Sequence, residues 1–264
     1  MEEDFSRKSG RLKPVFIDAI TDLLDELGMV REHIAAQATE HIHSAEIILT
    51  LGHSESVEAF LKAAGRKRKI TVVVAETAPS YSGRSLALSL SSASIPTLLV
   101  PDSAVYSLMS RVSKVILGTH IVHADGSLVA VTGALPMAKA AKAHNVPVVV
   151  VTGMFKVSND FTYRGETGTL LEELDNATPA EILRTHHSLA APGGNGEEAQ
   201  HIGVVPPNPD ADEEDLDLDT LVEKCEIVTP YWDRVPQELV TLFITNIGAH
   251  PSSMIFRLLK ELFE

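Results

Sequence analysis

Residues 46–75 read EIILTLGHSESVEAFLKAAGRKRKITVVVA, and this stretch decides the fold. It begins and ends with apolar runs, at 47–51 and 70–75. Runs of this kind, without alternation of polar and apolar residues, are typical of parallel strands that are covered on both faces. Between them lies one apolar stripe at helical spacing, formed by Val57, Phe60, Leu61 and Ala64. The stretch therefore predicts a strand, a helix and a second parallel strand.

The same unit recurs along the chain up to residue 156. Further apolar runs lie at 97–100, 115–117 and 146–151, each separated from the previous run by a segment that can form a helix. Such alternation with short loops predicts an α/β fold with a doubly wound, mainly parallel sheet of the Rossmann-like kind. Ligands in that architecture bind at the carboxyl ends of the strands, so we expect a functional site there.

Capping residues suggest where the helices of this repeat begin and end. Ser54 and Ser56 are candidate N-caps for the helix after the first strand, and Gly65 is expected to end it. Asp102 is a candidate N-cap for a helix that carries Val105, Leu108 and Met109. These signals place short loops between the strands and helices.

Two parts of the chain differ from this repeat. Residues 1–45 predict a lead-in followed by two helices, at 14–28 and 31–43, with Gly28 between them. The Rossmann-like domain is then expected over 46–264. Residues 189–219 are rich in proline, glycine and acidic residues, which predicts a disordered acidic insert within that domain.

The chain after the insert gives weaker signals. We expect a short strand at 227–229, a turn at 231–236, and either a helix start or a strand edge at 237–244. A wide apolar stripe predicts a final helix at 252–263.

Composition limits the classes of partner and compartment. The formal net charge is −14, from 36 acidic and 22 basic residues. This charge argues against direct binding of nucleic acid, and the basic run 66–69 is more simply the solvated end of a helix. Cys225 is the single cysteine, which excludes an internal disulfide and a thiolate metal cluster. No apolar run approaches the ~18 residues of a membrane span, so a cytosolic protein without membrane contact is expected.

Familiar catalytic and cofactor motifs are missing. The residues after the first strand fit neither a dinucleotide fingerprint nor a phosphate loop, and no nucleophile elbow is present. The histidine pairs His41 with His43 and His186 with His187 are weak metal candidates. We therefore expect neither cofactor nor metal. His120 follows a strand and could act as a general base or fill a structural position.

Two long segments carry a family resemblance. They are ILTLGHSESVEAFLKAAGRKRKITVVVAETAPSYSGRSLA at 48–87 and MSRVSKVILGTHIVHADGSLVAVTG at 109–133. They resemble the family that joins sugar-phosphate aldose–ketose isomerases to the regulatory subunits of eukaryotic translation initiation factor 2B. Within it, MFKVSNDF at 154–161 and YWDRVPQELVTLFITNIG at 231–248 most resemble the beta subunits.

The resemblance implies that isomerase chemistry has been lost. The isomerases' catalytic cysteine and aspartate correspond to Gly52 and His120. Their phosphate-clamping arginine corresponds to Ala78, and their Asn-Lys pair to Ala130 and Val131. Glycine cannot transfer a proton, and histidine does not simply replace a carboxylate in a tuned pair.

What the resemblance implies instead is a regulatory subunit without catalytic residues. Its complex exchanges GDP for GTP on initiation factor 2. The expected partners are the delta subunit, the other subunits of initiation factor 2B, and the alpha subunit of initiation factor 2. Residues 1–45 would be the remnant of a helical domain. The alternatives are a divergent sugar-phosphate isomerase and a sugar-phosphate or nucleotide sensor on the same scaffold.

Four apolar residues near the C-terminus are candidates for a subunit interface, with ordinary core packing as the alternative for each. They are Phe243, Ile247, Phe256 and Leu259.

Overall fold

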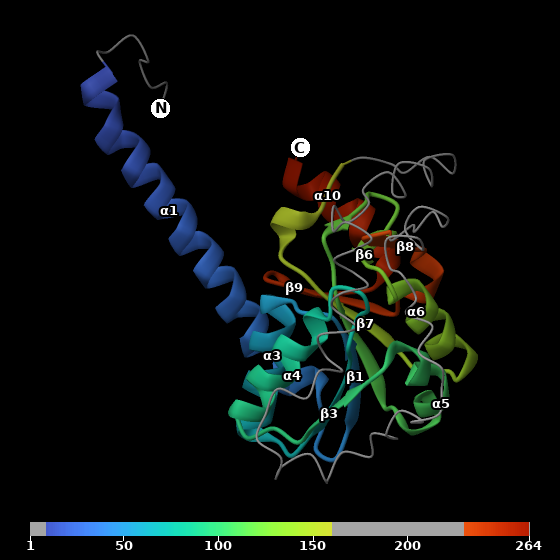
Figure 1. The fold of residues 1–264 in the computed structure, drawn as a ribbon. Coiled ribbons are helices and arrows are strands. Elements are labelled where there is room, and N and C mark those ends of the chain that lie inside the picture. Colours follow the sequence, from blue (N-terminus) through green and yellow to red (C-terminus); the bar gives the residue numbers. More distant parts are fainter. Residues whose placement is uncertain (1–8, 160–229, 264) are drawn as a thin grey trace, which may run out of the picture. The chain divides into compact units, whose positions relative to one another are not determined.

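A seven-stranded sheet forms the centre of the computed structural model, which describes residues 9–159 and 230–263 (Figure 1). All strands are parallel to their neighbours except β10, the last strand in the sequence, which is antiparallel to β9. In spatial order they are β10 (Gly248–His250), β9 (Leu242–Thr245), β7 (Val148–Val151), β4 (Lys114–Gly118), β1 (Ile47–Leu51), β2 (Thr71–Ala75) and β3 (Thr97–Val100). The predicted α/β class with a mainly parallel sheet is confirmed.

Helices cover both faces of the sheet (Figure 1). One face packs against α3 (Glu55–Lys67), α4 (Ser82–Ser92), the end of α1 (Ser9–Ala36) and α2 (Ala38–His41). The other face packs against α5 (Val105–Leu108), α6 (Ala134–Ala143) and α10 (Ile255–Phe263). Short 3₁₀ turns occupy η1 (Asp102–Ala104), η2 (Met109–Arg111), η3 (Met154–Lys156), η5 (Gln237–Leu239) and η6 (Ser252–Met254).

The unit β1–α3–β2 forms as the sequence predicts. All four residues of the α3 stripe are buried, and successive residues of β1 point into the two separate halves of the core. Gly65, however, does not end α3, which continues to Lys67. Its role is close packing, because a Cβ at Gly65 would lie 2.6 Å from the Ile95 side chain.

The predicted helix break at Gly28 is wrong. α1 runs without interruption from Ser9 to Ala36, and a Cβ at Gly28 would meet nothing within 4 Å. An exposed glycine costs a helix only about 1 kcal/mol relative to alanine, which is too little to stop it. Val30 and Ile34 bury the end of α1 against the core, while the preceding apolar residues of the helix are exposed.

The predicted turn at 231–236 is also wrong, because this segment contains a strand. β8 (Trp232–Val235) joins β5 (Ile121–Val122) and β6 (Leu128–Val131) in a small antiparallel sheet. Asp233 explains its polar sequence, since one carboxylate oxygen accepts the N–H groups of Gly133 at 2.8 Å and Leu135 at 3.1 Å. A residue that looks like part of a turn is thus the cap of α6.

The remaining predictions near the C-terminus have mixed outcomes. Residues 237–244 form η5 and then β9, so the strand alternative holds. The helix at 252–263 is confirmed as η6 and α10. The strand at 227–229, the acidic insert at 189–219, Cys225, His186 and His187 lie outside the described residues.

The predicted N-cap role of Asp102 is wrong, because Asp102 is the first residue of η1 rather than the residue before it. Its two carboxylate oxygens accept the N–H groups of Thr77 at 2.9 Å and Ala78 at 2.7 Å, and Pro101 occupies the N-cap position of η1. Asp102 therefore fixes the loop after β2. Within residues 9–159 and 230–263, no helix is both long and apolar enough to cross a membrane.

Candidate functional site

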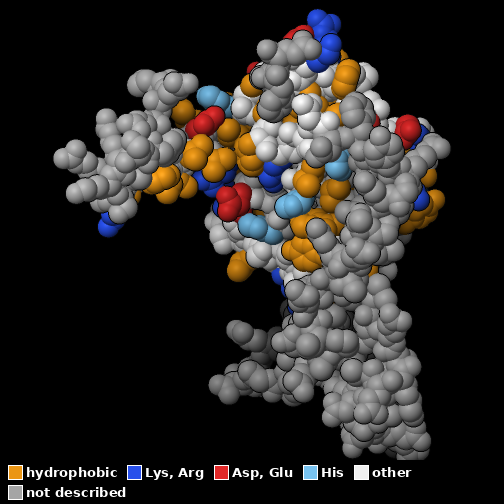
Figure 2. All heavy atoms as spheres, turned by 90° about the horizontal axis from the view of Figure 1, so that it is seen from above, with side chains coloured by type: hydrophobic (Ala, Val, Ile, Leu, Met, Phe, Trp, Pro, Cys, Tyr) orange, Lys and Arg blue, Asp and Glu red, His pale blue; other side chains and the backbone are white. Residues whose placement is uncertain are grey.

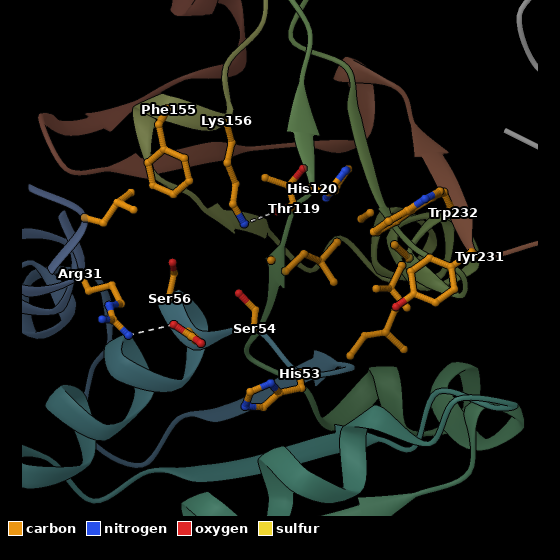
Figure 3. A pocket seen from close by; sticks show the side chains of 18 of the residues that line it. Arg31, His53, Ser54, Ser56, Thr119, His120, Phe155, Lys156, Tyr231 and Trp232 are labelled. Carbon is orange, nitrogen blue, oxygen red and sulfur yellow. Dashed lines mark hydrogen bonds and ion pairs between the residues drawn. The ribbon is translucent and has the colours of Figure 1, made fainter. Parts of the chain in front are cut away.

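A cavity of about 520 Å³ opens at the carboxyl ends of β1 and β4 (Figure 3). From β1 the chain winds in one direction through β2 and β3, and from β4 in the other through β7 and β9, so the strand order reverses between these two strands. This is the topological switch point, where open α/β sheets bind ligands. The expected location of the site is therefore occupied by a pocket.

Residues from distant parts of the chain line this pocket. Leu51 and Gly118 come from strand ends, Ser54 from the start of α3, Leu27 from α1, and Trp232 from the small sheet. Seen from above in Figure 2, this face carries histidine, acidic and basic side chains among apolar ones. The pocket thus combines a largely apolar wall with a few charged groups, as small-molecule sites commonly do.

Two basic side chains from different elements reach the pocket, across from Tyr231 and Trp232 (Figure 3). Arg31 Nη1 lies 2.8 Å from the Glu55 carboxylate, and this pair is exposed. Lys156 Nζ donates to the carbonyl oxygen of Thr119 at 2.8 Å. Burial lowers the pKa of Lys156, and nearby Glu55 opposes that shift. Glu55 balances the charge of Arg31, so the Lys156 ammonium is the group of the two that an anionic ligand would neutralise.

His53 lies at the mouth of the pocket and belongs to a network around Glu58. The Glu58 carboxylate lies 2.9 Å from His53 Nε2 and 2.7 Å from Lys62 Nζ, and it accepts a 2.5 Å hydrogen bond from the Ser89 hydroxyl. Burial raises the pKa of Glu58, but the hydrogen bonds from Lys62, Ser89 and His53 outweigh it and lower the pKa to about 2. Glu58 is therefore a fixed negative charge that orients its neighbours.

His120 lies where the sequence places it, directly after β4, and it lines the pocket. Its imidazole stacks on the indole of Trp232, with ring centroids 4.3 Å apart and an interplanar angle of 21°. Tyr231 meets the same indole edge-on at 4.5 Å. His120 is thus part of an aromatic wall, which supports the structural alternative for this residue.

The positions that correspond to isomerase residues come together only in part. A Cβ built on Gly52 would lie 3.3 Å from Ser82 Oγ and 3.8 Å from Val131 Cγ1, and Ala130, Val131 and His120 all line the pocket. Ala78 is exposed on the loop after β2 and is not among the lining residues. Gly52 has a φ of +63°, a conformation that disfavours a cysteine.

Sequence reasoning missed most charged and aromatic residues of the pocket. Arg31, Glu55, Lys156 and Trp232 come from four separate elements or loops. Glu55 and Lys156 have a local signal, because they follow β1 and β7 at the carboxyl edge of the sheet. Among the described residues, no group of three or more histidine, cysteine or acidic side chains could hold a metal ion.

The four candidate interface residues divide into two classes. Phe243 and Leu259 are 0% and 1% exposed and belong to the same core cluster, so the core alternative applies and the interface prediction for them is wrong. They pack in the layer between the sheet and α10. Ile247 and Phe256 are each 49% exposed and stay predictions.

Comparison with known proteins places this architecture in a family. A profile described as the initiation factor 2 subunit family matches residues 2–252. The chain belongs to the initiation factor 2 subunit family.

Curated relatives within the family narrow the similarity to the beta subunits, as the sequence predicts. The chain is 42% identical over 261 residues to the translation initiation factor eIF2B subunit beta of Dictyostelium discoideum. It is 36% identical over 255 residues to the same subunit of Schizosaccharomyces pombe. These matches include 99% and 96% of the chain but only 58% and 56% of the relatives.

The family also includes enzymes. The chain is 26% identical over 253 residues to ribose 1,5-bisphosphate isomerase of Pyrococcus furiosus, a match that covers 96% of this chain and 67% of the enzyme.

Two solved structures share the fold. One is the tetrameric eIF2B-beta2-delta2 complex from C. thermophilum, with a TM-score of 0.63, 21% identity, and coverage of 95% of this chain and 65% of the other. The other is 5-methylthioribose 1-phosphate isomerase from Pyrococcus horikoshii, with a TM-score of 0.69, 18% identity, and coverage of 98% and 65%.

Proposed function

We propose that this chain is a non-catalytic regulatory subunit of the factor that exchanges GDP for GTP on translation initiation factor 2. In this role it assembles with the delta subunit and with the remaining subunits of initiation factor 2B. It also helps to present a surface that senses the phosphorylated alpha subunit of initiation factor 2. Its compartment would be the cytosol.

The observation that carries this proposal is the glycine at position 52, in the loop between β1 and α3 beside the pocket. The isomerase cysteine position holds a glycine in a left-handed conformation, and it lies next to Val131, which stands at another lost position. An aldose–ketose isomerase must move a proton between adjacent carbons, and neither residue can do so. The scaffold persists without the groups that would make it an enzyme.

The similarity to the beta subunits supports the assembly role. One chain of a solved complex of beta and delta subunits has the same fold as this chain. A protein without its own chemistry acts through its surfaces, so its partners define its function.

The first test is association with the delta subunit of the same organism. We expect the two chains, when coexpressed, to elute together from a sizing column with the light-scattering mass of a mixed complex. The same preparation should not convert ribose 1,5-bisphosphate. A well-folded chain that stays apart from the delta subunit would overturn the proposal.

A sensor function is the second candidate, and the pocket itself favours it. Arg31 and Lys156 approach a cavity large enough for a sugar phosphate or a nucleotide. A metabolite that binds there should raise the melting temperature of the chain. We expect Lys156→Met to abolish such a shift, and Lys13→Met, on α1 outside the lining, to leave it unchanged.

A divergent isomerase is the third candidate, and it depends on His120 as a base. It would be supported by measurable turnover that His120→Ala removes. The stacking of His120 on Trp232 argues against this, because the ring is used as a wall of the pocket.

A further inference from the structure

The first part of α1 carries an apolar stripe that is open to solvent. Its six residues, which are between 41% and 62% exposed, are Phe16, Ile17, Ile20, Leu23, Leu24 and Leu27. Val30 and Ile34, further along the same helix, pack against the core. Helices in proteins owe most of their stability to the packing of such a face, and groups of exposed apolar residues mark binding sites. The stripe is therefore a surface that a partner can cover.

The spacing of the stripe is that of a coiled coil. Alternate steps of four and three residues lead along α1 through Phe16, Ile20, Leu23, Leu27, Val30 and Ile34. These steps are the spacing of heptad positions d and a, at which helices pack against one another. Ile17 and Leu24 each follow a d residue and so occupy position e, which widens the stripe. A stripe of this period fits another helix.

The stripe is self-complementary when two copies of α1 lie antiparallel. In such a pair, position a of one helix meets position d of the other. A two-fold axis between positions 21 and 22 places Ile20 against the partner's Leu23, and Phe16 against the partner's Leu27. The same two contacts are repeated on the other side of the axis, as in any isologous interface. A second copy of this chain thus supplies an apolar residue for each a and d position of the stripe.

The flanks of the stripe permit the same pairing. On one flank, Ile17 faces the partner's Leu24, so the e positions add apolar contact. On the other flank, Ala19 faces the partner's Glu26, so like charges do not meet at the contact. The remaining acidic residues of this part of α1 occupy the outer heptad positions c and f, and they are Asp18, Asp22 and Asp25.

The antiparallel arrangement also separates the acidic domains. A net charge of −14 on each copy opposes close approach. At 1.5 Å per residue, Val30 of one copy lies about 26 Å along the helix pair from Val30 of the other. Charges that are further apart than the Debye length of ~8 Å at physiological salt repel only weakly. A parallel pair would instead place both domains at the same end.

The size of the stripe sets the expected strength of the contact. With about half of each large side chain exposed, two copies would bury roughly 1,000 Å² in total, which is near the lower limit for a specific interface. We therefore expect weak association, with a Kd on the order of 10 μM.

We propose that two copies of this chain associate through α1, as an antiparallel pair of helices about a two-fold axis between positions 21 and 22. Any occupant of the stripe needs apolar residues at the same heptad spacing, and a second copy has them in its own sequence. The inference is independent of the proposed function, because it concerns the chain alone.

The first test measures the mass of the purified chain by light scattering over a range of concentrations. We expect a monomer at about 1 μM and mainly a dimer at about 200 μM. Ile20→Lys with Leu23→Lys places charges at the centre of the contact, so this variant should stay monomeric over the whole range. Both positions are exposed and lysine favours helices, so the melting temperature of the dilute chain should stay within a few degrees.

A matched control lies on the outer side of the same helix. Asp18→Asn with Asp25→Asn raises the net charge by two, as the lysine variant does, but at the f positions. This control should dimerise like the wild type. Equal loss of the dimer in the control would overturn the assignment to the stripe.

Cross-linking tests the orientation of the two helices. Phe16→Cys and Leu27→Cys are made separately in a Cys225→Ser chain, so that each protein has one cysteine. Oxidation of a mixture of the two should give a disulfide-linked dimer, whereas each protein alone should give little. Strong cross-linking of Phe16→Cys with itself would indicate a parallel pair and overturn the arrangement.

The remaining outcomes also decide the inference. A wild type that stays monomeric at all concentrations, or a lysine variant that still dimerises, would overturn it. Suppose that the chain alone is monomeric and the lysine variant fails to bind the delta subunit. Another subunit would then cover the stripe, and the choice of a second copy would be wrong while the assembly role stands. A chain that dimerises but does not bind the delta subunit would give the opposite result.

Discussion

The imidazole of His120 and the indole of Trp232 are stacked 4.3 Å apart across the wall of the pocket. This contact joins the end of β4 to β8, two elements more than a hundred positions apart in the sequence. Trp232 is the only tryptophan of the chain, so its fluorescence reports on this contact directly.

His120→Ala should shift the tryptophan emission to longer wavelength, because removal of the ring exposes the indole to water. His53→Ala is the control, since it lines the same pocket but contacts Glu58 instead. Emission spectra of the three proteins at equal concentration check this. An unchanged spectrum for His120→Ala would show that the rings do not stack in solution.

Gly52→Cys should not create an isomerase, and it should destabilise the chain by about 1–2 kcal/mol because the residue has a φ of +63°. The control is Gly28→Ala in the exposed part of α1, which should stabilise by up to about 1 kcal/mol. Denaturant unfolding measures both. A Gly52→Cys protein as stable as the wild type would mean that the loop after β1 can change its conformation.

Asp233→Ala should destabilise the chain by about 1–2 kcal/mol, because it removes the acceptor for two N–H groups at the start of α6. Asp233→Asn keeps an oxygen acceptor, so it should lose less stability than Asp233→Ala. Thermal unfolding of both variants tests the cap. Equal losses would indicate that the negative charge matters more than the hydrogen bonds.

The pH dependence of stability should depend in part on Glu58. Its pKa is lowered to about 2, so its stabilising contribution is complete above its ordinary pKa of 4.5 and is lost as the pH falls towards 2. The difference in unfolding free energy between the wild type and Glu58→Gln should therefore shrink between pH 5 and pH 3. Glu261→Gln, at an exposed ion pair on α10, is the control and should show little change.

Sequence patterns predict the large sheet well because the burial of its strands is visible in their amino-acid composition. The runs at 47–51 and 97–100 become β1 and β3 with the same bounds, and the other three runs differ from their strands by one or two residues at one or both ends. Strands that are covered on both faces must be apolar throughout, and this leaves a clear signal.

The small sheet could not be predicted in the same way. β8 contains Asp233 and Arg234, whose charges are used in a helix cap and in an ion pair with Asp125. The local sequence of β8 resembles a turn, because the residues that pair with Asp233 and Arg234 lie far away in the chain. The pattern also fails at Gly28, because a glycine resembles a helix end in the sequence but costs a continuous helix only about 1 kcal/mol.

The location of the pocket could be predicted from the sequence, but most of the residues that line it could not. Parallel strands fix the crevice at the switch point, and His120 was found because it directly follows a strand. Arg31 and Trp232 reach the pocket through packing between elements, which no local pattern encodes.

The small sheet also has a consequence for protein engineering. Val157 bridges Val122, and Trp232 pairs with Val131, so the described residues on both sides of positions 160–229 are anchored to residues 121–131. The register of β6 with β8 is set by these pairings and not by the length of chain between the anchors. An insertion between the anchors should therefore leave the small sheet intact, which makes this position a suitable place for a tag or a reporter domain.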